Sequence, residues 1–271
     1  MPRPMTKREI EEFYRRLKET RPIPQTELEF DNPFTLLVAV VLSAQATDAG
    51  VNKATPALFA AADTPDKMAA LGEERVAQFI RTIGLYRTKA KNVVRLSRIL
   101  VETYGGEVPR EREALEALPG VGRKTANVVL NVAFGEPTIA VDTHIFRVAN
   151  RTGLAPGKTP LAVEAGLNAR TPPQYKQYAH HWLILHGRYV CKARKPDCPV
   201  CVVADLCHYR AKTGPAEMIA AKAQASAAGS PTPRRRPSLA REEGEIAATP
   251  RSGAGRSRSR ASAPPARPSP K

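Results

Sequence analysis

The residues most suggestive of chemistry are two cations at the start of a predicted helix. In the segment LPGVGRKTANVVL, Arg123 and Lys124 open the second of two helices. The turn before them consists of Gly120, Val121 and Gly122. A helix N-terminus carries partial positive charge, so cations are disfavoured there unless an anion binds beside them. The pattern predicts a phosphate site, and the alternative is a plain helix–helix turn with a glycine cap.

The two glycines of this turn have separate expected uses. Small glycines let a phosphate approach the backbone N–H groups of the turn. We also expect Gly122 to adopt a backbone conformation that other residues resist. The flanking segments REREALEAL and RKTANVVLNVAF should form the two helices of the hairpin. The cationic pair and the basic chain favour the anion site over the plain turn.

The four cysteines of the chain form the second chemical cluster. They follow the spacing C-x6-C-x2-C-x5-C and are Cys191, Cys198, Cys201 and Cys207. In a chain that is expected to be intracellular, such clustering favours a metal centre over disulfides. Four thiolates suit a zinc ion or an iron–sulfur cluster, and the spacing alone leaves both open.

A basic loop separates the first two cysteines. Its sequence is KARKPD, with Lys192, Arg194 and Lys195 as the cations. Metal bonds at both ends would hold this loop rigid, which suits a phosphate-binding surface. The alternative is a solvated basic loop.

The elements that must position these residues are helices. Apolar residues recur at helical spacing behind a Thr6–Glu9 capping box, and the segment after Asn32-Pro33 is apolar nearly all round. Further helix starts are expected at Thr64-Pro65 and Thr159-Pro160, and helix ends at Gly84, Gly105, Gly135 and Gly153. These signals predict an all-α fold with about ten helices between Met5 and Arg210.

Charge and composition limit the classes of partner. The 271 residues include 42 Lys and Arg against 26 Asp and Glu, a formal net charge of +16, which indicates nucleic acid as partner. The first residues lack the apolar region of a signal peptide, and the longest apolar run, Phe34 to Ala44, is too short to span a bilayer. We therefore expect a soluble, cytoplasmic protein without a membrane partner.

The last part of the chain differs in composition from the rest. Residues 214–271 are rich in Pro, Ser, Gly, Ala and Arg without apolar periodicity. Such a segment cannot bury enough apolar surface to offset the entropy of ordering. We predict a disordered basic tail.

Four segments resemble the endonuclease III family of DNA glycosylases, over about Met5 to Lys212. The hairpin LPGVGRKTANVVL resembles that superfamily's helix-hairpin-helix, and TIAVDTHIFRVANRTG resembles the segment with its catalytic aspartate, here Asp142. The segments LLVAVVLSAQATD and TIGLYRTKA also resemble this family, as does the cysteine spacing. The resemblance implies a [4Fe–4S] cluster held by the four cysteines.

The resemblance also implies two helical lobes with a DNA-binding cleft between them. Residues 26–136 would form a six-helix lobe with the hairpin, and residues 1–25 and 137–213 the cluster lobe. Lys124 and Asp142 would meet in the cleft.

The activity implied is base excision repair of duplex DNA that contains oxidised pyrimidines or abasic sites. Lys124 would displace the base, form an imine at C1′ and allow β-elimination 3′ to the lesion. A lysine pKa near 10.4 must then fall by roughly three units, about 4 kcal/mol, whereas a helix terminus supplies at most ~2. Desolvation and the like charge of Arg123 should supply the remainder. Asp142 would stabilise the sugar's oxocarbenium character and accept the lysine proton. The alternative is that Asp142 caps the helix THIFRVAN, and the two roles are compatible.

The target base must leave the helix, and its space must be filled. The resemblance implies that Gln45 and Leu85 enter the duplex, and the alternative for Leu85 is ordinary core packing. His144 is a candidate phosphate contact. The protein would act as a monomer, associated with the nucleoid in a bacterial host.

Two other functions remain open. One is an adenine-mismatch glycosylase, although those enzymes lack the hairpin lysine and carry a further folded domain. The other is a non-catalytic helix-hairpin-helix DNA-binding protein with a zinc site.

Overall fold

The protein is helical throughout the part that the structure describes, residues 3–214 of a computed structural model. That range contains no strand, which confirms the predicted all-α class. The α-helices are α1 (Lys7–Thr20), α2 (Pro33–Leu42), α3 (Asp48–Ala61), α4 (Pro65–Phe79), α5 (Tyr86–Tyr104), α6 (Arg112–Glu116), α7 (Arg123–Phe134), α8 (Thr143–Thr152), α9 (Pro160–Arg170) and α10 (Lys176–Tyr189). Two 3₁₀ turns are η1 (Pro173–Tyr175) and η2 (Cys198–Val200).

Local capping signals set most of these boundaries. The Thr6–Glu9 capping box begins α1, and Asn32 caps α2 through the backbone N–H of Thr35. The predicted glycine stops after α5, α7 and α8 adopt left-handed C-cap conformations. The expected stop at Gly84 is wrong, because α4 already ends at Phe79 and Gly84 lies in the following turn.

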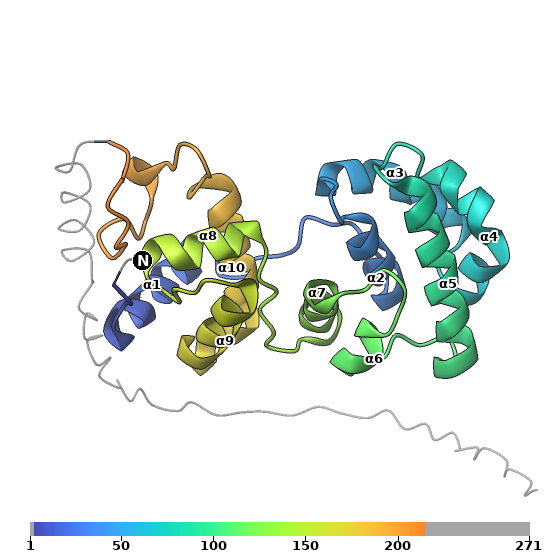
Figure 1. Cartoon of the computed structure of the whole chain (residues 1–271), viewed down its shortest axis with the longest axis horizontal. Coiled ribbons are helices and arrows are strands. Elements are labelled where there is room, and N and C mark those ends of the chain that lie inside the picture. The colour runs from blue at the N-terminus through green and yellow to red at the C-terminus, as the bar shows by residue number, and fades with distance from the viewer. Residues whose placement is uncertain (1–2, 215–271) are drawn as a thin grey trace, which may run out of the picture. The chain divides into compact units, whose positions relative to one another are not determined.

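A first hydrophobic core is built by α2 to α7 (Figure 1). Every residue of α2 from Phe34 to Leu42 is buried, so this helix runs through the core as its uniform apolarity predicts. The helices α5 and α7 both pack against α2. The predicted phosphate-binding hairpin consists of α6, the following turn and α7. Because α7 packs against α2, the hairpin is fixed to the core.

A second hydrophobic core joins α1 to α8, α9 and α10 (Figure 1). Tyr14 of α1 stacks on Tyr175 with ring centroids 5.6 Å apart, and the indole N–H of Trp182 donates to the Arg21 carbonyl at 2.8 Å. The backbone N–H of Met5 donates to the Gly153 carbonyl at 2.8 Å. The first helix of the chain therefore completes the core of the last ones.

The predicted tail lies outside the described residues, apart from Gly214. Within residues 3–214, no helix has the length and apolarity needed to cross a bilayer.

Candidate functional site

A cavity of about 450 Å³ brings together residues that are far apart in the sequence. Lys124 enters it from the start of α7, Asp142 and His144 from the start of α8, and Gln45 from the segment after α2. The remaining walls come from α10, from the segments before and after α2, and from single residues of other helices. Four of the predicted site residues thus share one cavity, whereas Leu85, the hairpin glycines and the basic cysteine loop do not line it.

Lys124 lies in the first turn of α7, where its side chain is exposed. The turn before it differs from the expectation in one respect. Gly122 has an extended backbone, φ −104° and ψ 176°, that any residue can adopt, so the expected special conformation there is wrong. The left-handed residue is Gly120, at φ +81°. A Cβ on Gly120 would also lie 2.9 Å from Nδ2 of Asn92, so glycine is required at this position.

The hairpin offers fewer N–H groups than its sequence suggests. The Val121 N–H donates to the Leu118 carbonyl at 3.0 Å and is therefore committed to the turn. No acceptor within residues 3–214 binds the N–H groups of Gly120 or Gly122. A Cβ on Gly122 would have no atom within 4 Å, so there is open space beside the Cα of this residue.

Asp142 caps α8 with one of its two carboxylate oxygens. Its Oδ1 accepts the N–H groups of His144 at 2.9 Å and Ile145 at 2.8 Å. No donor in the described residues is bound to Oδ2. The capping alternative is therefore correct, and it leaves a second oxygen for chemistry.

Close packing of α8 on α10 fixes the start of α8. Gly187 of α10 lies against His144, and a Cβ on that glycine would be 2.8 Å from the His144 Cβ. Arg147 donates to Nδ1 of His144 at 3.2 Å and to the Gly187 carbonyl at 2.8 Å. Asp142 is consequently held by helix packing as well as by its own capping bonds.

Two buried histidines, His180 and His181, line the same cavity. Burial, with the nearby charges of His181 and Lys124, lowers the pKa of His180 to about 3. Burial lowers the pKa of His181 to about 4. Both are therefore neutral at pH 7. In the sequence this pair stands on an apolar helix beside Trp182, a pattern typical of packing.

Two sets of ion pairs connect the helices around the cavity. Arg123 holds Glu164 of α9 with its Nε 3.1 Å and its Nη2 2.8 Å from the carboxylate. Arg188 of α10 holds Asp48 at 2.6 Å and also pairs with Glu27. The guanidinium of Arg123 is thus engaged by a carboxylate, and its predicted DNA contact stays a prediction.

Gln45 and Leu85 share an uncommon backbone conformation. They are the two non-glycine residues with positive φ in the described range, at +54° and +59°. Such conformations cost about 1–3 kcal/mol and persist where the surrounding structure imposes them. Gln45 is exposed, and Leu85 is 62% exposed, so the core-packing alternative for Leu85 is wrong.

The four cysteines line a separate cavity, with Arg151, His186 and Tyr209 among its other walls. Burial raises the pKa of Cys201 to about 12 and also raises that of Cys207, with the neighbouring thiols adding to both shifts. Within residues 3–214, no three ligating side chains converge closely enough for one metal ion. The four thiols around one cavity provide the ligand set of an iron–sulfur cluster.

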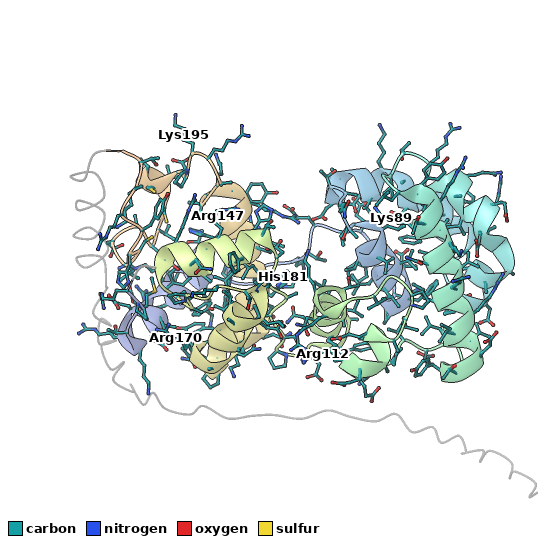
Figure 2. The ribbon with its side chains drawn as sticks, in the orientation of Figure 1. Lys89, Arg112, Arg147, Arg170, His181 and Lys195 are labelled. Atoms are coloured by element: carbon teal, nitrogen blue, oxygen red, sulfur yellow. The ribbon has the colours of Figure 1, made fainter. Side chains whose placement is uncertain are left out.

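Two arginines of α8 fasten the loop between the first two cysteines. Arg147 donates to the Cys191 carbonyl at 2.9 Å, and Arg151 donates to the carbonyls of Lys192 and Ala193 at 2.7 and 2.6 Å. The three cations of the loop are exposed, and Figure 2 shows Lys195 extending away from the ribbon. The loop presents positive charge on a fixed backbone.

Comparison with known proteins identifies the class and then the family. Residues 38–173 match the model of the HhH-GPD superfamily of base excision DNA repair proteins. Residues 191–207 match the iron–sulfur binding domain of endonuclease III. The class defined by this fold and site is a helix-hairpin-helix DNA repair enzyme.

The similarity to individual proteins is extensive. Endonuclease III of Escherichia coli (strain K12) is 60% identical over 208 residues, which cover 77% of this chain and 99% of that protein. Endonuclease III of Haemophilus influenzae is 57% identical with the same coverage. The solved structure of a trapped endonuclease III–DNA covalent intermediate, an estranged-adenine complex, matches with a TM-score of 0.71 and 48% identity, covering 75% of this chain and 96% of that one.

The chain belongs to the endonuclease III family. It is a DNA glycosylase with abasic-site lyase activity that acts on oxidised pyrimidines, binds DNA and carries a [4Fe–4S] cluster. These findings confirm the predicted family, activity and cofactor.

Proposed function

We propose that Lys124 is the nucleophile and that Asp142 is its partner in the reaction. The observation that carries this proposal is their shared cavity, reached from the first turns of α7 and α8. The Lys124 amine attacks C1′ of the damaged nucleotide, and the base leaves with the electrons of its glycosidic bond. The C1′–O4′ bond then breaks, O4′ takes a proton, and the opened sugar carries an imine between C1′ and Lys124. The imine acidifies the C2′ proton, whose removal expels the 3′ phosphate as the C3′–O bond breaks.

The charge on Lys124 must be removed before it attacks. Arg123 supplies little repulsion, because Glu164 neutralises it. Lys124 is also exposed in the protein alone. The desolvation that favours the free amine therefore has to come largely from DNA covering the cavity, among neutral histidines that add no counter-charge. This places activation of the nucleophile after substrate binding.

Asp142 has two tasks in this scheme. Its Oδ1 keeps α8 capped, and its Oδ2 stabilises positive charge on the sugar and takes the lysine proton. The trapped covalent intermediate of the related endonuclease III supports a covalent route. It also disfavours the non-catalytic DNA-binding alternative.

The DNA-binding residues surround this centre. The N–H groups of Gly120 and Gly122, with Val121 and Arg123 beside them, form the hairpin contact to a phosphate. Gln45 and Leu85 enter the duplex where the damaged base leaves. His144 contacts a phosphate near Asp142. The exposed cations of the cysteine loop bind DNA phosphates at a greater distance from the damaged nucleotide. These cations are Lys192, Arg194 and Lys195.

The four cysteines Cys191, Cys198, Cys201 and Cys207 are proposed to hold the cluster. The cluster supplies rigidity to the basic loop, since every catalytic candidate lies in the other cavity. We further propose two lobes, residues 26–136 and residues 1–25 with 137–213. The protein acts as a cytoplasmic monomer on duplex DNA with damaged pyrimidines or abasic sites, and its basic charge supports association with the nucleoid.

A nicking assay tests the function. Duplexes of one sequence carry an oxidised pyrimidine, an abasic site, an adenine mismatch or no lesion. We expect strand cleavage of the first two and none of the others. Removal of adenine without cleavage would support the mismatch glycosylase, and binding without any reaction would support the non-catalytic protein.

A further inference from the structure

A buried lysine connects the two segments that carry Gln45 and Leu85. Lys89, in the first turn of α5, is only 5% exposed, and its Nζ donates to the Leu42 carbonyl at 2.9 Å. No carboxylate within residues 3–214 forms an ion pair with it. Figure 2 shows Lys89 in the region where α5 and α2 lie together.

The position of Lys89 relates directly to both left-handed residues. Leu42 is the last residue of α2, and Gln45 follows three residues later. Leu85 is the N-cap of α5, and its carbonyl accepts the backbone N–H of Lys89 at 3.0 Å. One residue therefore bonds to the Leu85 position through its backbone and to the end of α2 through its side chain.

Packing alone does not explain a lysine at this buried position, because burying its ammonium group costs free energy. Burial penalises the charged ammonium and lowers the pKa of Lys89. Methionine has similar length and would fill the same space without a charge to desolvate. The last turn of α2 contains no cation of its own, although the C-terminal carbonyls of a helix favour one. Lys89 supplies that cation from another helix.

The cap of α5 gives a second reason why this link matters. Leu85 has no side-chain capping bond to offer, and its φ of +59° is intrinsically unfavourable. Gln45 lies in an equally unfavourable conformation in the segment after α2. A rigid connection between the two segments resists relaxation of either residue toward ordinary backbone angles.

We propose that Lys89 is a positioning residue for base flipping, which holds the Gln45 and Leu85 segments in fixed relation so that both side chains enter the duplex together. This inference rests on the proposed roles of Gln45 and Leu85. Lys89 itself is buried and does not line the cavity that contains Lys124 and Asp142.

The test measures base unstacking separately from chemistry. A duplex carries 2-aminopurine opposite an oxidised pyrimidine, and stopped-flow fluorescence follows its unstacking after mixing with the full-length protein. We expect Lys89→Met to slow this signal by about 10- to 100-fold, as small displacements of positioned groups do. Borohydride trapping on a single-stranded abasic oligonucleotide should change by less than about threefold, because it needs no flipping.

Three further variants make the outcome specific. Lys91→Met removes an exposed charge from the same helix, and this variant should unstack the 2-aminopurine at the wild-type rate. Lys89→Gln also breaks the bond to Leu42 and replaces Lys89→Met if that variant does not fold, as judged by its thermal transition. Leu85→Ala tests the proposed function itself and should slow unstacking.

The two possible failures are distinguishable. Slow unstacking in Leu85→Ala together with wild-type unstacking in a folded Lys89→Met or Lys89→Gln overturns the inference and leaves the proposed function intact. Wild-type unstacking in Leu85→Ala overturns the proposed role of Leu85, and the inference with it.

Discussion

The carboxylate of Asp142 divides its two oxygens between structure and chemistry. Oδ1 accepts two backbone N–H groups at the start of α8, and Oδ2 has no bound donor within residues 3–214. An asparagine keeps an oxygen for the cap but loses the negative charge. The structural and chemical tasks of this residue can therefore be separated by a single substitution.

We expect Asp142→Asn to fold normally and to lose base excision by about 10²–10⁴-fold. The lysine amine remains, so some borohydride trapping on preformed abasic DNA should survive. Single-turnover excision and trapping, measured side by side, check this expectation. Equal loss of both activities would show that the carboxylate is needed for the amine rather than for departure of the base.

The sequence was enough to propose the two central residues of the site, but not the contacts around them. Lys124 and Asp142 could be proposed from the sequence, and the structure places them in one cavity, although their roles stay predictions. The bond from Arg123 to Glu164 spans 41 residues and follows no local pattern. The neutral state of His180 likewise depends on burial, which no sequence motif encodes.

At the scale of elements, the two glycines of the hairpin between α6 and α7 have different tasks. Gly120 serves folding, and Gly122 is proposed to serve DNA binding. Gly120 needs a left-handed backbone and has no space for a Cβ, whereas Gly122 needs neither. Gly120→Ala should therefore lower the free energy of unfolding, by at least the ~1–2 kcal/mol of the left-handed conformation. Chemical denaturation measures this loss.

Gly122→Ala is the matched variant for the same hairpin. It should unfold at the wild-type denaturant concentration and bind abasic DNA more weakly, because its methyl group occupies the space beside the N–H groups. Fluorescence anisotropy with a labelled duplex measures the Kd. Unchanged affinity in Gly122→Ala would mean that no phosphate approaches this backbone.

Helix boundaries were predictable where a cap or a left-handed glycine is local. Thr6, Asn32 and Gly135 mark the ends expected of them. The helix end predicted at Gly84 is wrong, because α4 ends at Phe79 with Ile80 as its C-cap and the chain then turns before α5. The left-handed state of Leu85 could not be predicted, since leucine has no local preference for it.

At the scale of the whole molecule, the basic loop between the cysteines that would hold the cluster is bound to α8 by Arg147 and Arg151. Protein purified from iron-replete cells should be yellow-brown and contain about four irons per chain. We expect Cys198→Ser to lower thermal stability and DNA affinity, while any bound complex still reacts. Iron analysis, melting curves and single-turnover rates at saturating enzyme test this. Colourless, zinc-loaded protein from such cells would contradict the [4Fe–4S] cluster.

Acid stability should depend on His180 and His181, two of the three buried histidines of α10. Their folded pKa values are about 3 and 4, below the 6.5 of an exposed histidine. The unfolded chain therefore binds protons first as pH falls below 6.5, and stability declines by at most about 1.4 kcal/mol per pH unit for each histidine. Between pH 6 and 5, most carboxylates have not yet titrated. In this range His180→Gln should reduce the slope of stability against pH by about 1.4 kcal/mol per pH unit, which corresponds to one bound proton. An unchanged slope would contradict the burial of a neutral His180.

The central claim concerns the amine of Lys124, and borohydride trapping tests it most directly. Lys124→Gln keeps a similar length and leaves the N–H groups of Gly120 and Gly122 in place, so it should still bind abasic DNA. Mixed with that DNA and borohydride, the wild-type protein should form a covalent protein–DNA species on a denaturing gel, and Lys124→Gln should form none and should not nick the strand. Undiminished trapping in Lys124→Gln would contradict the account and assign the nucleophile to another amine.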